Sequence, residues 1–237
     1  MRHGAPRRCA CGGRRAVNAF LAVLWKDLLC EWRSRDRLVA MLVFSALVVV
    51  VFHFALPGGA SAQTRANAPG LLWVATIFAA LLGLGRAFAI ELENDALSGL
   101  ALAPAERGWI FLGKWAANVV ILGLVQAVTA LVFAVVFEVD LLPVLWPFAG
   151  IALLGSVGLC AIGTLAAAVA VRTRFRELLL PLLVLPLLWP VLSGAVRGTA
   201  ELLETGSVSF EPLQLLLVTD ATYLILSFLT FEYVLDE

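Results

Sequence analysis

The chain has 237 residues and a formal net charge of zero, and 62% of its residues are hydrophobic while only 14% are charged. Its apolar residues form runs of about 20 or more, which is the length of a membrane-spanning helix and is too long for the core of a soluble domain. We therefore predict an integral membrane protein and expect no nucleic-acid partner.

Two segments precede the first apolar run. Residues 1–16 are polar and basic, and we predict a disordered tail that contacts anionic lipid. Residues 17–35 predict an amphipathic helix in the membrane interface, because apolar and polar side chains separate at helical spacing. The apolar face has Val17, Phe20, Leu21, Leu24, Trp25, Leu28, Leu29 and Trp32, and the opposite face has Asn18, Lys26, Asp27, Glu31 and Arg33.

The rest of the chain, residues 36–237, predicts a single membrane domain with six spanning helices, because a helix pairs all its backbone groups where water is absent. The fold class is therefore all-α. The predicted spans are Leu38–Leu56, Gly70–Ile90, Gly108–Phe137, Val144–Val171, Leu178–Val196 and Pro212–Leu235. Prolines 181, 186 and 190 predict kinks in the fifth span. We expect Ser193–Glu211 to be an outer segment with a short surface helix.

Basic residues are distributed unevenly between the two sides of these spans. Nine Lys and Arg residues precede residue 38, three lie in 86–114 and three in 172–176, whereas only Arg65 and Arg197 lie in the alternate loops. Because Lys and Arg concentrate in cytoplasmic loops, we predict that both termini are cytoplasmic. We expect no cleavable signal, since the first apolar run follows a long polar stretch.

The segment between the second and third spans is the strongest indication of function. Glu91, Glu93 and Asp95 would place carboxylates in a first helical turn, Leu97 and Leu100 follow at helical spacing, and Pro104 ends the run. A helix of about three turns with one apolar stripe neither spans a bilayer nor folds alone. Residues 91–104 therefore predict a cytoplasmic helix that docks on a soluble partner. The alternative is a helix lying on the lipid surface.

Two ionisable side chains within predicted spans are candidate functional residues, because charges inside a membrane are costly unless they face protein or water. Asp220 would either line a pathway or pair with a polar group such as Gln126 or Thr129. His53, near the outer end of the first span, would either make a structural hydrogen bond or serve as a ligand or substrate contact. A third group, Arg172, Arg174, Arg176 and Glu177, sets topology and is a candidate contact for a cytoplasmic partner or lipid.

The sequence contains no recognisable catalytic, metal or cofactor site. Gly108-Trp-Ile-Phe-Leu-Gly113-Lys114 has P-loop spacing, but Trp115 replaces the Ser or Thr that binds magnesium and no strand precedes it. Cys9 and Cys11 lack a second pair of ligands. Because no nucleophile–base set or carboxylate pair is visible, we do not expect an enzyme.

Several short motifs, in order and spacing, resemble the CcmB family of haem exporter permeases over about residues 17–237. They are Gly70-Leu-Leu-Trp-Val-Ala, Arg86-Ala-Phe88, Glu91-x-Glu93-x-Asp95-Ala-Leu97, Leu100-x-Leu102-x-Pro104, Leu112-Gly113-Lys114-x-x-x-Asn118, Val157-Gly158, Ile162-Gly163-Thr164, Val171-Arg172-Thr-Arg174 and Arg176-Glu177-x-x-Leu-Pro181. The chain departs from the family in its long basic tail and in His53.

The resemblance implies a permease subunit with ABC-exporter architecture in the bacterial inner membrane. It implies a separate cytoplasmic ATPase (CcmA-like), dimerisation of the permease, haem-handling maturation proteins as further partners, and a role in delivering haem to periplasmic c-type cytochromes. Haem would be the handled species, with no cofactor resident in this chain. Residues 91–104 would be the coupling helix. The alternatives are an ABC exporter permease for a lipid, glycan or drug, and a membrane scaffold that transports nothing.

Overall fold

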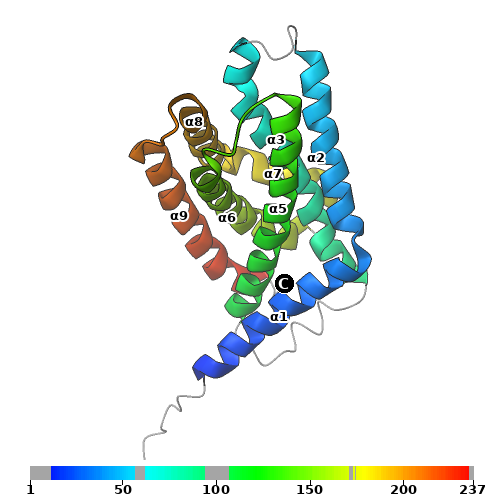
Figure 1. Ribbon diagram of the computed structural model, residues 1–237. Helices are drawn as coiled ribbons and strands as arrows, with labels where there is room; N and C mark the ends of the chain where they lie inside the picture. The colour runs from blue at the N-terminus through cyan, green and yellow to red at the C-terminus, as the bar shows by residue number, and fades with distance from the viewer. Residues whose placement is uncertain (1–11, 57–61, 94–106, 171–172, 174, 235–237) are drawn as a thin grey trace, which may run out of the picture.

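A computed structural model describes residues 12–56, 62–93, 107–170, 173 and 175–234, and the regular structure in these ranges is entirely helical (Figure 1). The helices are α1 (Gly12–Ser34), α2 (Asp36–Ala55), α3 (Ala62–Glu93), α5 (Arg107–Val136), α6 (Leu145–Ala170), α7 (Arg176–Leu187), α8 (Trp189–Thr205) and α9 (Phe210–Val234). The all-α class is thus confirmed. Helix α1 begins at Gly12, so residues 12–16 of the segment predicted as a tail belong to this helix.

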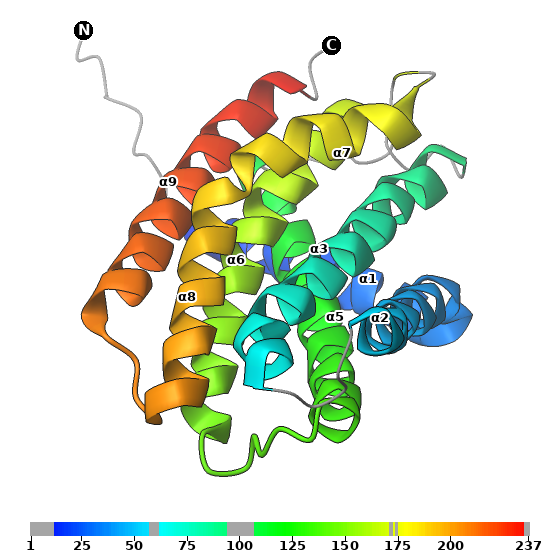
Figure 2. The same cartoon turned by 90° about the horizontal axis from the view of Figure 1, so that it is seen from above.

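Helix α6 is the centre of the bundle, and α2 and α9 lie on opposite sides of it (Figure 2). In the most apolar stretch of α6, 78% of the residues are buried, whereas only 17% are buried in the corresponding stretches of α2 and α9. Helix α6 is rich in Gly, Ala, Ser and Thr. Small residues let neighbouring helices approach closely, which matters in lipid because no hydrophobic force drives helices together there.

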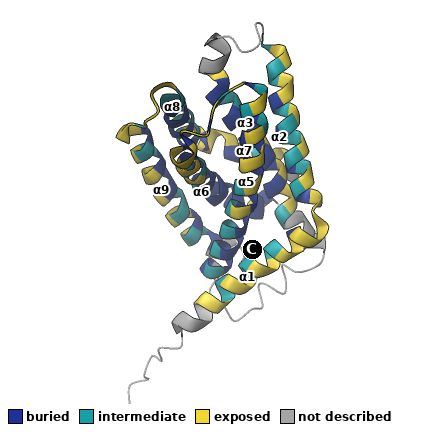
Figure 3. Cartoon of the chain, in the orientation of Figure 1, coloured by how far each residue is buried: buried dark blue, intermediate teal, exposed yellow. Residues whose placement is uncertain are grey.

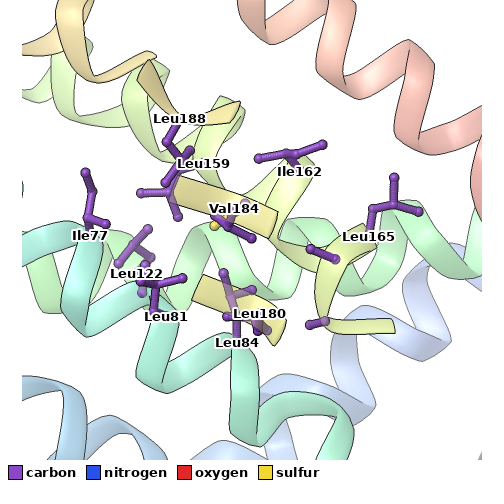
Figure 4. Close-up of a cluster of buried hydrophobic side chains, with 14 of the residues drawn as sticks. Ile77, Leu81, Leu84, Leu122, Leu159, Ile162, Leu165, Leu180, Val184 and Leu188 are labelled. Carbon is purple, nitrogen blue, oxygen red and sulfur yellow. The ribbon is translucent and has the colours of Figure 1, made fainter. Parts of the chain in front are cut away.

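The core between the helices is made of interdigitating aliphatic side chains. Figure 4 shows how α3, α5, α6 and α7 converge on one cluster. Its labelled members are Ile77, Leu81, Leu84, Leu122, Leu159, Ile162, Leu165, Leu180, Val184 and Leu188. This packing fixes the short helix α7 against the central helix, although α7 has only 12 residues.

Among the described residues, five helices are long and apolar enough to cross a membrane, and α7 with α8 forms a sixth if the bent pair is one span. The two helices meet at Leu188 and differ in direction by 61°. Pro186 lies just before the break and Pro190 just after it. Because Pro190 has no N–H, it cannot bond the carbonyl four residues earlier. The kink predicted from these prolines is therefore present as a complete break.

The prediction that Ser193–Glu211 is an outer segment is wrong for most of its length. Helix α8 continues to Thr205, and only residues 206–209 connect it to α9. The continuation is packed inside the bundle, because Gly194, Ala195, Gly198, Thr199 and Leu202 are all buried. The polar residues of this stretch, such as Arg197 and Glu204, lie on the exposed side of α8, and its other side is buried. The prediction took these polar residues as a sign of an outer segment.

Helix α1 lies across one end of the bundle, beneath the first turns of α5 (Figure 1). The C-terminal ends of α2, α5 and α8 lie at the opposite end. The side of α1 that faces away from the bundle is exposed (Figure 3). The large hydrophobic residues exposed on α1 are Val17, Leu21, Trp25, Leu29 and Trp32. An exposed stripe with two Trp side chains suits the membrane–water interface.

The crossing of α1 and α5 depends on Gly113. A Cβ atom at this position would lie 2.9 Å from Val23 Cβ and 3.0 Å from the carbonyl oxygen of Phe20. Both atoms belong to α1, and the second is backbone, so a side chain at residue 113 would force the two helices apart.

We expect the substitution Gly113→Ala to lower the apparent melting temperature of the detergent-purified protein by several degrees. Overpacking typically costs about 1–3 kcal/mol. Gly123→Ala is the matched control in the same helix, because nothing lies within 4 Å of its added Cβ. Equal thermal stability of the two variants would show that α1 does not pack closely on α5.

Candidate functional site in the membrane bundle

The junction between α1 and α2 is a tight turn built on one residue, Arg35, with φ of 55°. The N–H of Arg35 donates to the carbonyl of Glu31 at 2.8 Å, which closes the last turn of α1. The carboxylate of Glu31 then accepts the N–H of Leu38 at 2.8 Å. Glu31 thus satisfies one of the free N–H groups of the first turn of α2, where a negative charge is favoured.

Two ion pairs join α1 to the bundle at this junction. Arg37 Nε lies 3.5 Å from Glu31 Oε2, and each side chain is only 9% exposed. Lys114 Nζ lies 3.3 Å from Asp27 Oδ2, and the Lys114 side chain is 4% exposed. Buried charges are costly unless paired, so these contacts hold α1 at a fixed place and orientation.

A chain of hydrogen bonds connects this junction to α6 at the centre of the bundle. Nη2 of Arg37 donates to Oδ1 of Asn118 at 2.8 Å, and Nδ2 of Asn118 donates to Oγ1 of Thr164 at 3.0 Å. We call Glu31, Arg37, Asn118 and Thr164 the buried polar chain. It connects four helices, α1, α2, α5 and α6, through side chains that are all buried.

The sequence interpretation of α1 is therefore wrong for two residues. Asp27 and Glu31 were placed on the polar face opposite the apolar one, but they point into the bundle at Lys114 and Arg37. An amphipathic pattern cannot separate charges that face water from charges that face a buried partner. Lys114 and Asn118, polar residues among apolar ones in α5, were the signal that could have shown this contact.

Other polar residues of the spans pair with one another. Ser45 and Thr129 share a hydrogen bond of 2.8 Å, and Ser156 donates to Gln126 at 2.6 Å. Gln126 and Thr129 are thus engaged with α6 and α2, and neither pairs with Asp220 as the sequence suggested. The space beside Gln126, lined also by Trp73, Thr76 and Phe148, has a volume of about 10 Å³ and holds at most one water molecule.

Asp220 lies in α9 against the start of α8 and the middle of α6. Only 4% of the residue is exposed, and neither carboxyl oxygen has a hydrogen-bond partner among the described residues. A Cβ added to Gly158 of α6 would overlap Asp220 Oδ1 and would come within 3.1 Å of Val191. The absence of a side chain at Gly158 therefore makes the space that the carboxyl group occupies.

Tyr223, three residues after Asp220, contacts the helix break. Its hydroxyl donates to the carbonyl of Leu187, the last residue of α7. A carbonyl at the end of a helix has no partner within that helix, and a side chain from α9 satisfies this one. Asp220 and Tyr223 thus place one helical turn of α9 directly beside the α7–α8 break.

His53 is part of an aromatic cluster in the last turn of α2. Its ring meets Phe54 and Phe137 edge-on, with centroid distances of 5.5 and 5.6 Å. No described residue forms a hydrogen bond with its buried Nδ1 atom. Metal-binding histidines usually donate their second N–H to an acceptor, so this environment favours a packing role.

Most of the predicted docking residues lie outside the described part of the chain. Residues Asp95, Leu97, Leu100 and Pro104 do so, as do the side chains of Glu91 and Glu93. The backbone of α3 extends through Glu93. The first two carboxylates therefore belong to the last turn of α3 rather than to the first turn of a separate helix.

The basic connection after α6 is also only partly described. Arg172 and Arg174 lie outside the described residues, and Arg176 and Glu177 begin α7. Thr173 donates both its N–H and its hydroxyl to the carbonyl of Ala170, which closes the end of α6.

The segment with P-loop spacing, Gly108 to Lys114, is helical and lies in the first turns of α5. Its residues have packing roles, because Gly108 lies under the ring of Phe228 and Lys114 contacts Asp27. A P-loop wraps phosphate with loop backbone, which a continuous helix cannot do. Among the residues whose placement is described, no three His, Cys, Asp or Glu side chains form a metal site.

The sequence model of the family described as CcmB protein matches residues 18–234. The chain belongs to the CcmB family. The match covers α1 from its second turn and every other helix, so the buried polar chain, Gly158 and Asp220 all lie within it.

Similar relatives from this family are named heme exporter protein B. The protein from Rhodobacter capsulatus is 33% identical over 165 residues, which is 69% of this chain and 74% of the relative. That from Paracoccus denitrificans is 34% identical over 164 residues, with the same coverage of each chain. That from Pseudomonas aeruginosa is 31% identical over 189 residues, or 78% of this chain and 83% of the relative.

We expect Arg37→Leu to destabilise the protein strongly, by about 3–5 kcal/mol, because it leaves the Glu31 carboxylate buried without its cation. The measurement is thermal unfolding in detergent. Arg33→Gln is the control, since Arg33 is exposed on the same end of the bundle. The double variant Glu31→Gln, Arg37→Leu should recover part of the loss, and no recovery would contradict the pairing.

Proposed function

We propose that this chain is the membrane permease subunit of an ABC transporter system that exports haem for the assembly of c-type cytochromes. The observation that carries the proposal is the family match across residues 18–234, together with relatives that are named heme exporter protein B. The helical bundle supports it, because in the described ranges five helices and one broken pair are long and apolar enough to span a membrane. No catalytic role is assigned to this chain, and ATP hydrolysis would take place in a separate subunit.

The proposed orientation places α1 at the cytoplasmic face of the inner membrane. Lys and Arg cluster before residue 38, in 86–114 and in 172–176, and the helix ends that carry these segments lie on the α1 side of the bundle (Figure 1). The positive-inside rule then gives cytoplasmic termini. Trp25 and Trp32, exposed on α1, would lie at the level of the lipid headgroups.

The proposed docking element is the segment 91–104, at the cytoplasmic end of α3 and just before α5. Closure of an ATPase dimer would displace this segment, and a displacement would reach the ends of α3 and α5 directly. Helix α1 would follow α5, because the close contact at Gly113 and the Lys114–Asp27 pair join them. We propose two permease copies around the paired ATPase, with further haem-handling membrane proteins as partners.

The direct test is haem staining of c-type cytochromes in a host that lacks this gene, with and without a plasmid that restores it. We expect staining to be lost in the deletion strain and recovered with the plasmid. Unchanged staining in the deletion strain would overturn the proposal and would favour the export of another substrate.

Docking is tested by neutralising the acidic cluster with Glu91→Gln, Glu93→Gln and Asp95→Asn in one variant. We expect the amount of ATPase that co-purifies to fall several-fold, while the amount of permease in the membrane is unchanged. The matched control neutralises Asp140, Glu204 and Glu211, which are exposed at the opposite end of the bundle. Equal recovery of the ATPase with both variants would exclude the acidic cluster as the docking element.

A further inference from the structure

Asp220 differs from the other buried charges of the bundle. Arg37 and Lys114 each contact a carboxylate of α1. Asp220 is as deeply buried, yet in the part of the chain that the structure describes neither of its oxygens has a hydrogen-bond partner. An ionised carboxylate taken out of water without a partner is strongly disfavoured, and such a group becomes neutral instead. The contacts of Asp220 therefore do not account for a negative charge.

Among the side chains that the structure describes on the helices packed against Asp220, none offers it a cation. Helix α6 contains no Asp, Glu, Lys, Arg or His between Leu145 and Ala170. On α8, Arg197 is exposed to the surroundings rather than buried with Asp220. Lys114 of α5 contacts Asp27. The remaining titratable groups on the packed elements whose side chains are described are Cys160, Glu201, Glu204, Glu211 and Tyr223.

Neither a metal ion nor a basic residue of a second protein chain fits the surroundings of the Asp220 carboxyl group as well as a proton does. Hard cations require six or more oxygen ligands, or retained water, around the ion. Here Gly158 and Val191 fill the space beside Oδ1, and the Tyr223 hydroxyl already donates to Leu187. A basic residue of a partner subunit cannot reach oxygens that are covered by α6 and α8. A proton needs no additional ligand and no space.

We propose that Asp220 is a proton-binding site inside the membrane, which the bundle holds as a carboxylic acid between α6, α8 and α9. Release of the proton would require water at the carboxyl group, and therefore movement at the α7–α8 break. Val191, which packs at the Gly158–Asp220 contact, lies three residues beyond the break at Leu188. An ionised Asp220 would favour an arrangement in which the start of α8 has moved away from α6.

The test is infrared spectroscopy of the full chain in lipid nanodiscs at pH 7.5, with ¹³C in the side-chain carboxyl groups of aspartate. A carboxyl group that is fully hydrated is ionised at this pH and contributes no acid band. We expect a protonated-carboxyl C=O band that shifts with the isotope and disappears in Asp220→Asn. Absence of the band in the wild-type protein, or its persistence in the variant, would overturn the proposal.

A second variant keeps the test decisive if Asp220→Asn does not accumulate. Gly158→Ala should shift the frequency of the acid band, because the new methyl group overlaps Asp220 Oδ1. Gly123→Ala, which meets nothing within 4 Å, should leave it unchanged. A band that is insensitive to Gly158→Ala would assign it to another aspartate. These spectra require no haem, so their outcome is independent of the proposed transport function.

Discussion

The architecture depends on the need to keep Arg37 paired where α1 meets the bundle. A guanidinium that is only 9% exposed needs an anion and further acceptors, and it obtains them from Glu31 and Asn118. Glu31 also binds the first turn of α2, and Asn118 extends the contacts to Thr164. One buried charge therefore fixes the positions of four helices. The apolar core adds packing but has no comparable directional requirement.

The sequence was sufficient to predict the helices, because long apolar runs in a chain that must pair its backbone leave few alternatives. Each predicted span overlaps a helix, or in one case the α7–α8 pair. The direction of individual charges was not predictable in this way. Asp27 and Glu31 have the spacing of a solvated face, and only the three-dimensional placement of Lys114 and Arg37 shows that they are internal.

The motifs that indicated the CcmB family coincide with contacts that hold the bundle together. Gly113 permits the crossing of α1 and α5, Asn118 and Thr164 belong to the buried polar chain, and Gly158 provides the space for Asp220. Each motif is too short to fold as a unit. Each motif residue contacts a residue far away in the sequence, as Gly158 contacts Asp220. No single motif could therefore have revealed these contacts.

The single left-handed residue at Arg35 has a mechanical consequence. Because only one residue connects the two helices, α1 cannot move far relative to α2, and the two helices move together. With Asp27 and Glu31 fastened to α5 and α2 as well, its exposed tryptophans cannot change depth or tilt independently of the spans. Any tilt of α2 or α5 would therefore carry α1 and its two exposed tryptophans with it.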